Sequence, residues 1–103
     1  MAGLLNEALG RWPGVRIAPM FGRWGYFTGA TLFACFPLDP RQGDLWIRLT
    51  RADQSRALDL PGVVPHRRFG AQGWIEYRVD GPRDVGRALR LLRQGYRSTS
   101  ATD

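Results

Sequence analysis

Short runs in which hydrophobic and polar residues alternate recur along the chain and predict β-strands. The clearest runs, in which every second side chain is apolar, are residues 15–18, 45–49 and 74–79. Two further apolar runs, 26–27 and 32–36, flank Thr28-Gly29-Ala30 and predict a hairpin. The second of these runs is apolar on both faces, so we expect it near the middle of the sheet.

Apolar residues at helical spacing predict three helices. The first has an apolar side made of Leu4, Leu5, Ala8, Leu9 and Trp12 and stops at Pro13-Gly14. A short second helix, 51–58, follows Thr50 as its capping residue. The third begins after Asp80, with Pro82 in its first turn, and reaches Tyr96-Arg97. Residues 63–73 are predicted to be irregular, and residues 98–103 to form a disordered polar tail.

This order of elements predicts an α+β two-layer sandwich. Strands linked by hairpins form an antiparallel sheet, here of about five strands, and the helices at both ends of the chain can cover one of its faces. With 103 residues, the chain has the size of one domain, which we place at residues 1–97.

Alternation along the strands assigns side chains to the two faces of the sheet. The helix-facing set is expected to be Val15, Ile17, Leu45, Ile47, Leu49, Ile75, Tyr77 and Val79. The opposite face then carries Arg16, Trp46, Arg48, Trp74, Glu76 and Arg78. Tryptophan and arginine are enriched at binding hot spots, so Trp46, Trp74, Arg48, Arg78 and Arg16 are candidate partner-binding residues.

Three explanations of that face remain open. Cation–π contacts and a Glu76–Arg78 ion pair could simply hold neighbouring strands together. The face could bind a protein partner or a second copy of the chain. It could also stack on the bases of single-stranded nucleic acid.

The charge balance keeps nucleic acid among the candidate partners. Fifteen basic side chains, all of them arginine, stand against nine acidic ones and give a net charge of +6. A positive charge permits contact with nucleic acid without demonstrating it. The candidate contacts are Arg67 and Arg68 in the basic segment that starts at His66, and Arg90 and Arg93 on the last helix, although such a row can equally be a solvated helix face.

Residues that carry catalytic or metal chemistry are sparse. With one histidine and one cysteine, the chain cannot build a zinc site from several such ligands. His66 has no serine and aspartate at a spacing that indicates a catalytic triad, and Gly22-Arg23-Trp24-Gly25 lacks the pattern of a phosphate-binding loop. We therefore expect no enzyme activity, no cofactor and no metal.

No run is long enough to cross a membrane, and the N-terminus lacks the features of a secretory signal. We accordingly expect a cytoplasmic protein without membrane contact.

The segment from Pro19 to Phe27, which reads Pro-Met-Phe-Gly-Arg-Trp-Gly-Tyr-Phe, resembles the TfoX N-terminal-domain family. That family shows a Met-Phe-Gly-x-x-Gly-Tyr/Phe segment, and the resemblance continues through Leu32-Phe33-Ala34, residues 45–49, Leu60-Pro61-Gly62-Val63 and Gly73-Trp74.

The resemblance implies a fold similar to type III secretion chaperones and a non-enzymatic, regulatory role associated with transcription and competence in bacteria. Because the chain stops at Asp103, we expect the domain to stand alone, without the C-terminal domain of the competence regulators. The family motif residues Met20, Phe21, Gly22, Gly25 and Tyr26 are expected to be structural, with the first two sealing one end of the core.

Overall fold

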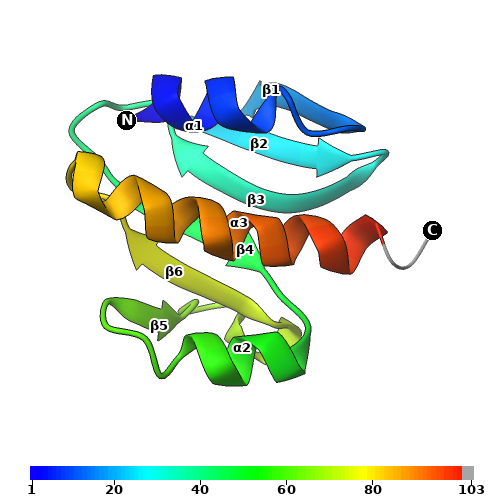
Figure 1. Ribbon diagram of the computed structural model, residues 1–103, viewed down its shortest axis with the longest axis vertical. Helices are drawn as coiled ribbons and strands as arrows, with labels where there is room; N and C mark the ends of the chain where they lie inside the picture. Colours follow the sequence, from blue (N-terminus) through cyan, green and yellow to red (C-terminus); the bar gives the residue numbers. More distant parts are fainter. Residues whose placement is uncertain (101–103) are drawn as a thin grey trace.

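The computed structural model describes residues 1–100 and contains a six-stranded antiparallel sheet with the strand order β1-β2-β3-β4-β6-β5 (Figure 1). The strands are β1 (Val15–Met20), β2 (Arg23–Thr28), β3 (Thr31–Pro37), β4 (Asp44–Arg48), β5 (Val63–Pro65) and β6 (Trp74–Arg78). Every neighbouring pair runs antiparallel, as expected for strands joined mostly by short connections.

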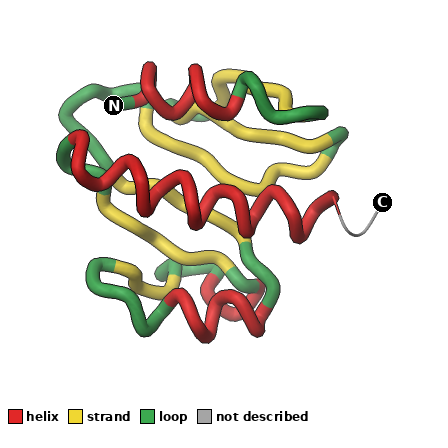
Figure 2. Tube along the Cα trace, in the orientation of Figure 1, coloured by secondary structure: helices red, strands yellow, loops and turns green. Residues whose placement is uncertain are grey.

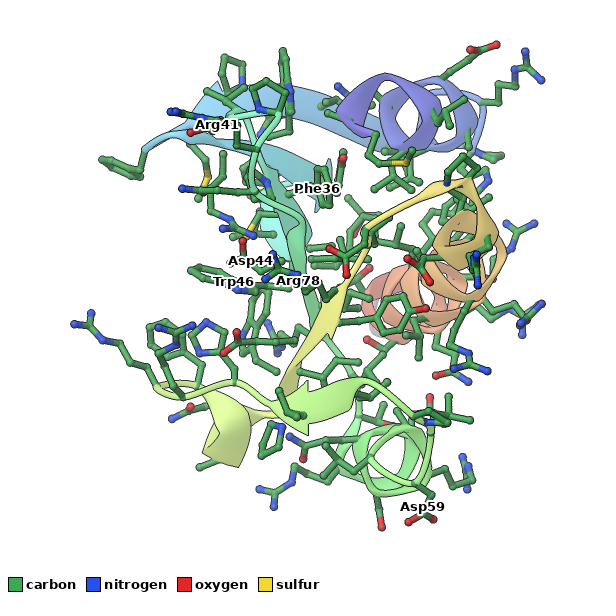
Figure 3. The ribbon with its side chains drawn as sticks, turned by 90° about the vertical axis from the view of Figure 1, so that its left-hand side faces the viewer. Phe36, Arg41, Asp44, Trp46, Asp59 and Arg78 are labelled. Atoms are coloured by element: carbon green, nitrogen blue, oxygen red, sulfur yellow. The ribbon has the colours of Figure 1, made fainter. Side chains whose placement is uncertain are left out.

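Three helices lie on one face of this sheet. They are α1 (Ala2–Leu9), α2 (Arg51–Ala57) and α3 (Val85–Ser100). Helix α3 crosses the middle of the sheet, with α1 beside it near β1 and β2 and α2 at the opposite end near β5 and β6 (Figures 1 and 2). Figure 3, which views the sheet nearly edge-on, shows the helices on one side and a free face on the other. The predicted α+β two-layer sandwich is therefore confirmed.

The core lies between the helices and the sheet. The side chains predicted to face the helices do so. Those of β4, β6 and the residues just after them are at least 94% buried: Leu45, Ile47, Leu49, Ile75, Tyr77 and Val79. Those of β1, Val15 and Ile17, are half-buried against the core. Tyr26 is fully buried, and its hydroxyl donates a 2.8 Å hydrogen bond to Asn6 Oδ1 on α1. This bond satisfies the polar end of a large core side chain.

Several predicted boundaries need correction. The region 63–73 is not wholly irregular, because Val63–Pro65 pairs with β6 as a sixth strand, too short to show an alternating pattern. The first helix ends at Leu9, not at Pro13. Residues 98–100, predicted to belong to a disordered tail, continue α3; the rest of that tail, 101–103, lies outside the described residues.

The turn between β1 and β2 consists of Phe21 and Gly22, both with positive φ (50° and 78°). This backbone suits a two-residue hairpin but disfavours a bulky side chain such as phenylalanine. The Phe21 side chain is 97% exposed. The expectation that Phe21 seals the core is therefore wrong, because the turn holds it away from the helices.

Candidate ligand-binding site

The free face of the sheet carries a hollow of about 340 Å³ with an almost wholly apolar lining. The turn between β1 and β2 forms one side of the hollow, and the segment between β5 and β6 forms the other. The lining residues are Met20, Phe21, Arg23, Leu32, Cys35, Trp46, Phe69 and Trp74. Their side chains come from β1, β2, β3, β4, β6 and both connecting segments, so five of the six strands assemble the site.

Trp46 stands in the lining of this hollow and is held between two other side chains. Figure 3 shows its ring pointing away from the helices. The Arg23 guanidinium lies over the ring at 3.7 Å from its centroid. The ring of His66 meets it edge-on, with centroids 4.4 Å apart. These contacts fix the indole in one orientation, as a preformed binding surface requires.

Arg23 is the only charged residue among these lining residues, and its charge is compensated by a neighbouring carboxylate. Its side chain is 13% exposed and pairs with Asp44, with an Nη1–Oδ2 distance of 3.2 Å. It also donates to the Asp44 carbonyl and to Cys35, at 3.2 Å from both Sγ and the carbonyl oxygen. Burial raises the pKa of the Cys35 thiol, although Arg23 acts against that shift. The lining therefore offers neither a free charge nor a thiolate near neutral pH.

Gly25 opens the centre of this face. A Cβ atom there would lie 2.8 Å from the Phe27 ring and 3.1 Å from the Met20 sulfur. Because glycine has no Cβ, the side chains of Phe27 and Met20 can pack directly over β2. Gly25 therefore lies inside β2 and not in a turn, beneath two side chains of the free face.

His66 organises the segment that forms the far side of the hollow. Its Nδ1 accepts hydrogen bonds from the backbone N–H groups of Arg68 and Phe69, both at 3.1 Å. Nδ1 must be unprotonated to do this, so the ring proton lies on Nε2. Burial lowers the pKa of His66, which keeps the ring neutral. The imidazole is therefore a structural anchor for Phe69, which stacks on it at 5.1 Å.

Two buried N–H groups lie around the same rings. Neither Trp46 Nε1 nor His66 Nε2 has a hydrogen-bond partner among the described residues. A buried donor without a partner is uncommon and costs free energy. Trp46 lines the hollow itself, whereas His66 packs behind it against the Trp46 ring.

The ion pairs on this face differ from the one expected. Glu76 pairs with Arg67 at 3.3 Å, and Arg78 pairs with Asp80 at 2.8 Å, so the predicted Glu76–Arg78 pair does not form. Glu76 instead meets Arg67 on the segment between β5 and β6, and Arg78 meets Asp80 just after the end of its own strand. Burial would raise the pKa of Glu76, but its hydrogen bonds from Arg67 outweigh this and lower it.

The structure separates the predicted site residues into four groups. Trp46 and Trp74 line the hollow, whereas Arg16, Arg48 and Arg78 are exposed elsewhere on the same face. Arg67 and Arg68 line an adjoining hollow of about 300 Å³ beyond Trp46 and Phe69. Arg90 and Arg93 lie on α3, in the helix layer. Of the motif residues, Met20 and Phe21 line the hollow, Gly22 completes the turn, Gly25 lies beneath Phe27 and Met20, and Tyr26 belongs to the core. The expectation that Met20 seals the core is therefore wrong as well, because its side chain lies on the free face.

Four lining residues were missed by sequence reasoning. Arg23, Leu32, Cys35 and Phe69 gave no periodic signal that places them together. Phe69 lies in a segment with no strand or helix pattern, and only its contact with His66 explains its position. The one sequence signal for its position was an apolar side chain directly after the polar and basic residues His66-Arg67-Arg68.

Metal ligands and membrane spans are not found in the part of the chain that the structure describes. Within residues 1–100, no three histidine, cysteine or acidic side chains gather closely enough to hold a metal ion. The described helices are likewise too short or too polar to cross a bilayer.

A comparison with known families matches residues 37–95 to the model of the Luciferase domain. The match covers more than half of the 103 residues, from the end of β3 into α3, and includes Trp46, Phe69 and Trp74. It overturns the expected membership of the TfoX N-terminal-domain family, whose Met-Phe-Gly segment here lies outside the matched region. No curated protein and no solved structure matches the chain. The chain belongs to the Luciferase domain family.

Proposed function

We propose that this protein binds a flat, mainly apolar organic molecule in the hollow on the free face of the sheet. The observation that carries the proposal is the hollow itself, about 340 Å³ in volume and lined by four aromatic side chains, Met20, Leu32 and a thiol, together with the paired Arg23. Its volume lies at the lower end of the range for small-molecule sites, which are mostly apolar with a few polar groups.

The aromatic walls favour a flat ligand. Phe21 projects from the turn with 97% of its surface exposed, and Phe69 faces solvent with 46% exposed. Ring stacking adds about 0.5–1.5 kcal/mol per aromatic pair beyond the burial of area. A planar molecule can therefore be held between the turn and the segment that carries Phe69, above Trp46.

The polar groups of the site favour a ligand with an uncharged acceptor. Arg23 is already paired with Asp44, while the N–H groups of Trp46 and His66 lack partners. A carbonyl or ether oxygen on the ligand would satisfy the Trp46 donor once the indole turns to expose its N–H to the hollow. The description of the family, Luciferase domain, names an enzyme class, so the test below also follows whether a bound compound is consumed.

The test uses 2-naphthol as a flat aromatic probe and its saturated analogue, decahydro-2-naphthol, as the control compound. Backbone NMR shifts of the isotope-labelled protein would be followed during titration with each compound. We expect 2-naphthol to shift residues of the hollow and the saturated analogue to bind about tenfold more weakly. Absorbance and photon counting on the same samples would show whether a bound compound is also consumed.

Phe21→Ala is the matched variant, because its exposed side chain contributes little to the core. We expect it to weaken 2-naphthol binding by about fivefold or more. Leu4→Ala, which removes a half-exposed side chain on α1, is expected to change nothing. Shift changes confined to residues outside the hollow, or equal effects of the two variants, would refute the proposal.

A second candidate function is the interaction module expected from the sequence. It is supported by the exposed apolar side chains of Phe21, Val64 and Phe69, which all lie on the free face or at its margin. Exposed apolar patches often mark protein interfaces. The experiment that separates it from ligand binding measures the association state, as described in the Discussion.

A further inference from the structure

The helix layer carries a row of arginines that form no ion pair with an acidic side chain within residues 1–100. Arg83 precedes α3, and the other members lie three or four residues apart along it: Arg87, Arg90, Arg93 and Arg97. This spacing puts them on one side of the helix. We call these five residues the α3 arginine row.

Across the residues that the structure describes, most arginines outside the α3 arginine row form ion pairs, whereas those of the row do not. Six arginines form ion pairs within the described residues, namely Arg11, Arg23, Arg41, Arg56, Arg67 and Arg78. Nine do not, and five of these nine belong to the α3 arginine row. Like charges three or four residues apart on a helix destabilise it slightly. The row therefore slightly destabilises its helix, and no ion pair in the described part of the chain offsets this.

An aromatic platform lies beside the row. The ring of Trp12 packs against Tyr96 at 5.3 Å, and the Arg93 guanidinium lies 4.6 Å from the centre of the indole. These groups border a hollow of about 430 Å³ that is lined by Trp12, Leu89, Arg90, Arg93, Gln94 and Arg97. Gln94 Oε1 is buried there without a hydrogen-bond partner among the described residues. The hollow thus combines stacking surfaces, three arginines and an unsatisfied amide.

We infer that the α3 arginine row and the Trp12 hollow bind single-stranded nucleic acid. Guanidinium groups along one side of a helix can contact successive phosphates, and from Arg87 to Arg97 the row extends about 15 Å at 1.5 Å per residue. Aromatic rings and arginine planes stack on unpaired bases, and a side-chain amide can pair with a base edge. This surface is separate from the ligand hollow, which lies on the opposite face of the sheet.

The same observations disfavour the other polyanionic surfaces. The apolar side of α3 is buried in the core, with Ala88, Leu91 and Leu92 at most 2% exposed, so the helix has nothing to insert into a membrane. A duplex hides its bases, and an acidic peptide has none, so neither would use Gln94 and the Trp12 platform together. We therefore expect the nucleic acid to contact α3 and not the sheet face, because Arg67 and Arg78 on that face are already paired with Glu76 and Asp80.

Fluorescence anisotropy of labelled oligo-dT and oligo-U of about 12 nucleotides tests the inference. The probe variant is Arg90→Ala/Arg93→Ala/Arg97→Ala. The control is Arg16→Ala/Arg48→Ala/Arg68→Ala, which removes the same charge from three arginines that form no ion pair and lie on or beside the sheet face. Circular dichroism establishes that each variant is folded, and Arg90→Ala/Arg97→Ala serves as a milder probe that leaves the Arg93–Trp12 contact intact.

We expect the probe variant to bind the oligonucleotides about tenfold or more weakly than the control variant. The slope of log affinity against log salt should also fall by about two units, because each lost phosphate contact contributes roughly 0.7. Equal losses in both variants would overturn the inference, because they would indicate non-specific attraction. A larger loss in the control would place the contact on the sheet face. Tighter binding to a duplex of the same length, or to vesicles that contain phosphatidylserine, would also overturn it.

Discussion

At the scale of single residues, His66 shows how a side chain that looks like part of a basic surface becomes an internal support. The sequence places it before two arginines, yet it is only 4% exposed and its Nδ1 anchors two backbone N–H groups. Protonation would place the ring's second proton on Nδ1 and remove both hydrogen bonds. Burial is the main cause that lowers the pKa of His66. Among the neighbouring charges, Glu76 raises this pKa, whereas Arg67, Arg23 and Arg68 lower it.

The protonation of His66 predicts a pH-dependent stability. Because its pKa is lower in the folded protein than its ordinary value of 6.5, the folded state binds fewer protons than the unfolded state. The free energy of unfolding is therefore highest above that value and falls as the pH drops from it through the folded pKa. Urea unfolding at several pH values between about 7.5 and 5 measures the effect above the range where carboxylates titrate.

His66→Asn is the matched variant, since an amide oxygen can accept the same backbone hydrogen bonds but does not titrate. We expect its unfolding free energy to be flat across this pH range. The chain has one histidine, so a variant that keeps the slope of the wild type would show that His66 is not its source.

At the scale of elements, α3 packs closely on the sheet because it carries Gly95 where the two meet. A Cβ atom at Gly95 would lie 2.8 Å from the Ile47 side chain and 3.1 Å from the carbonyl oxygen of Arg48 on β4. In the sequence alone this glycine only lowers the helical propensity of the segment. The tertiary structure gives it a role, because it lets the longest helix lie close over the middle of the sheet.

Gly95→Ala and Gly86→Ala form a matched pair within α3. We expect Gly95→Ala to lower the free energy of unfolding, because overpacking costs about 1–3 kcal/mol and outweighs the gain in helical propensity. Gly86 is exposed, and a Cβ there would meet nothing within 4 Å, so Gly86→Ala is expected to raise stability by about 0.5 kcal/mol. Urea unfolding followed by circular dichroism measures both; a stabilising effect of Gly95→Ala would contradict the close contact.

At the scale of the whole molecule, the two outer surfaces have different chemistry. The free face of the sheet carries an apolar hollow whose nearby acidic groups, Asp44 and Glu76, are paired with arginines. The helix layer carries the α3 arginine row. A domain of about 31 × 30 × 24 Å can therefore present an apolar ligand site and a cationic surface on opposite sides.

The second candidate function predicts self-association through the free face of the sheet. Sedimentation velocity at increasing protein concentration would then show a dimer, and Phe21→Ser would restore the monomer by removing the most exposed aromatic ring. Val64→Ser, on the edge strand β5, would weaken the dimer less. A monomer at every concentration would eliminate a second copy as the occupant of this face.

Much of the architecture was predictable because strand alternation is a local property. Burial of every second residue in β4 and β6 fixes which side chains face the helices, and the structure confirms that assignment residue by residue. Strand β5 was not predictable in this way, since three residues carry no period and its pairing depends on β6. The family resemblance was wrong: it rested on short motifs along the chain, whereas the family model that matches residues 37–95 is that of the Luciferase domain.

The sequence by itself determined the fold class, the two faces of the sheet and the excess of arginine, because each follows from local periodicity or from composition. Only the tertiary structure decided which charges are neutralised and which side chains meet. Arg23, Cys35, Trp46 and Phe69 lie far apart in the chain and come together because β2, β3 and β4 pair in register and His66 anchors the following segment. The physical reason is that a binding site depends on contacts between distant segments, which no local pattern records.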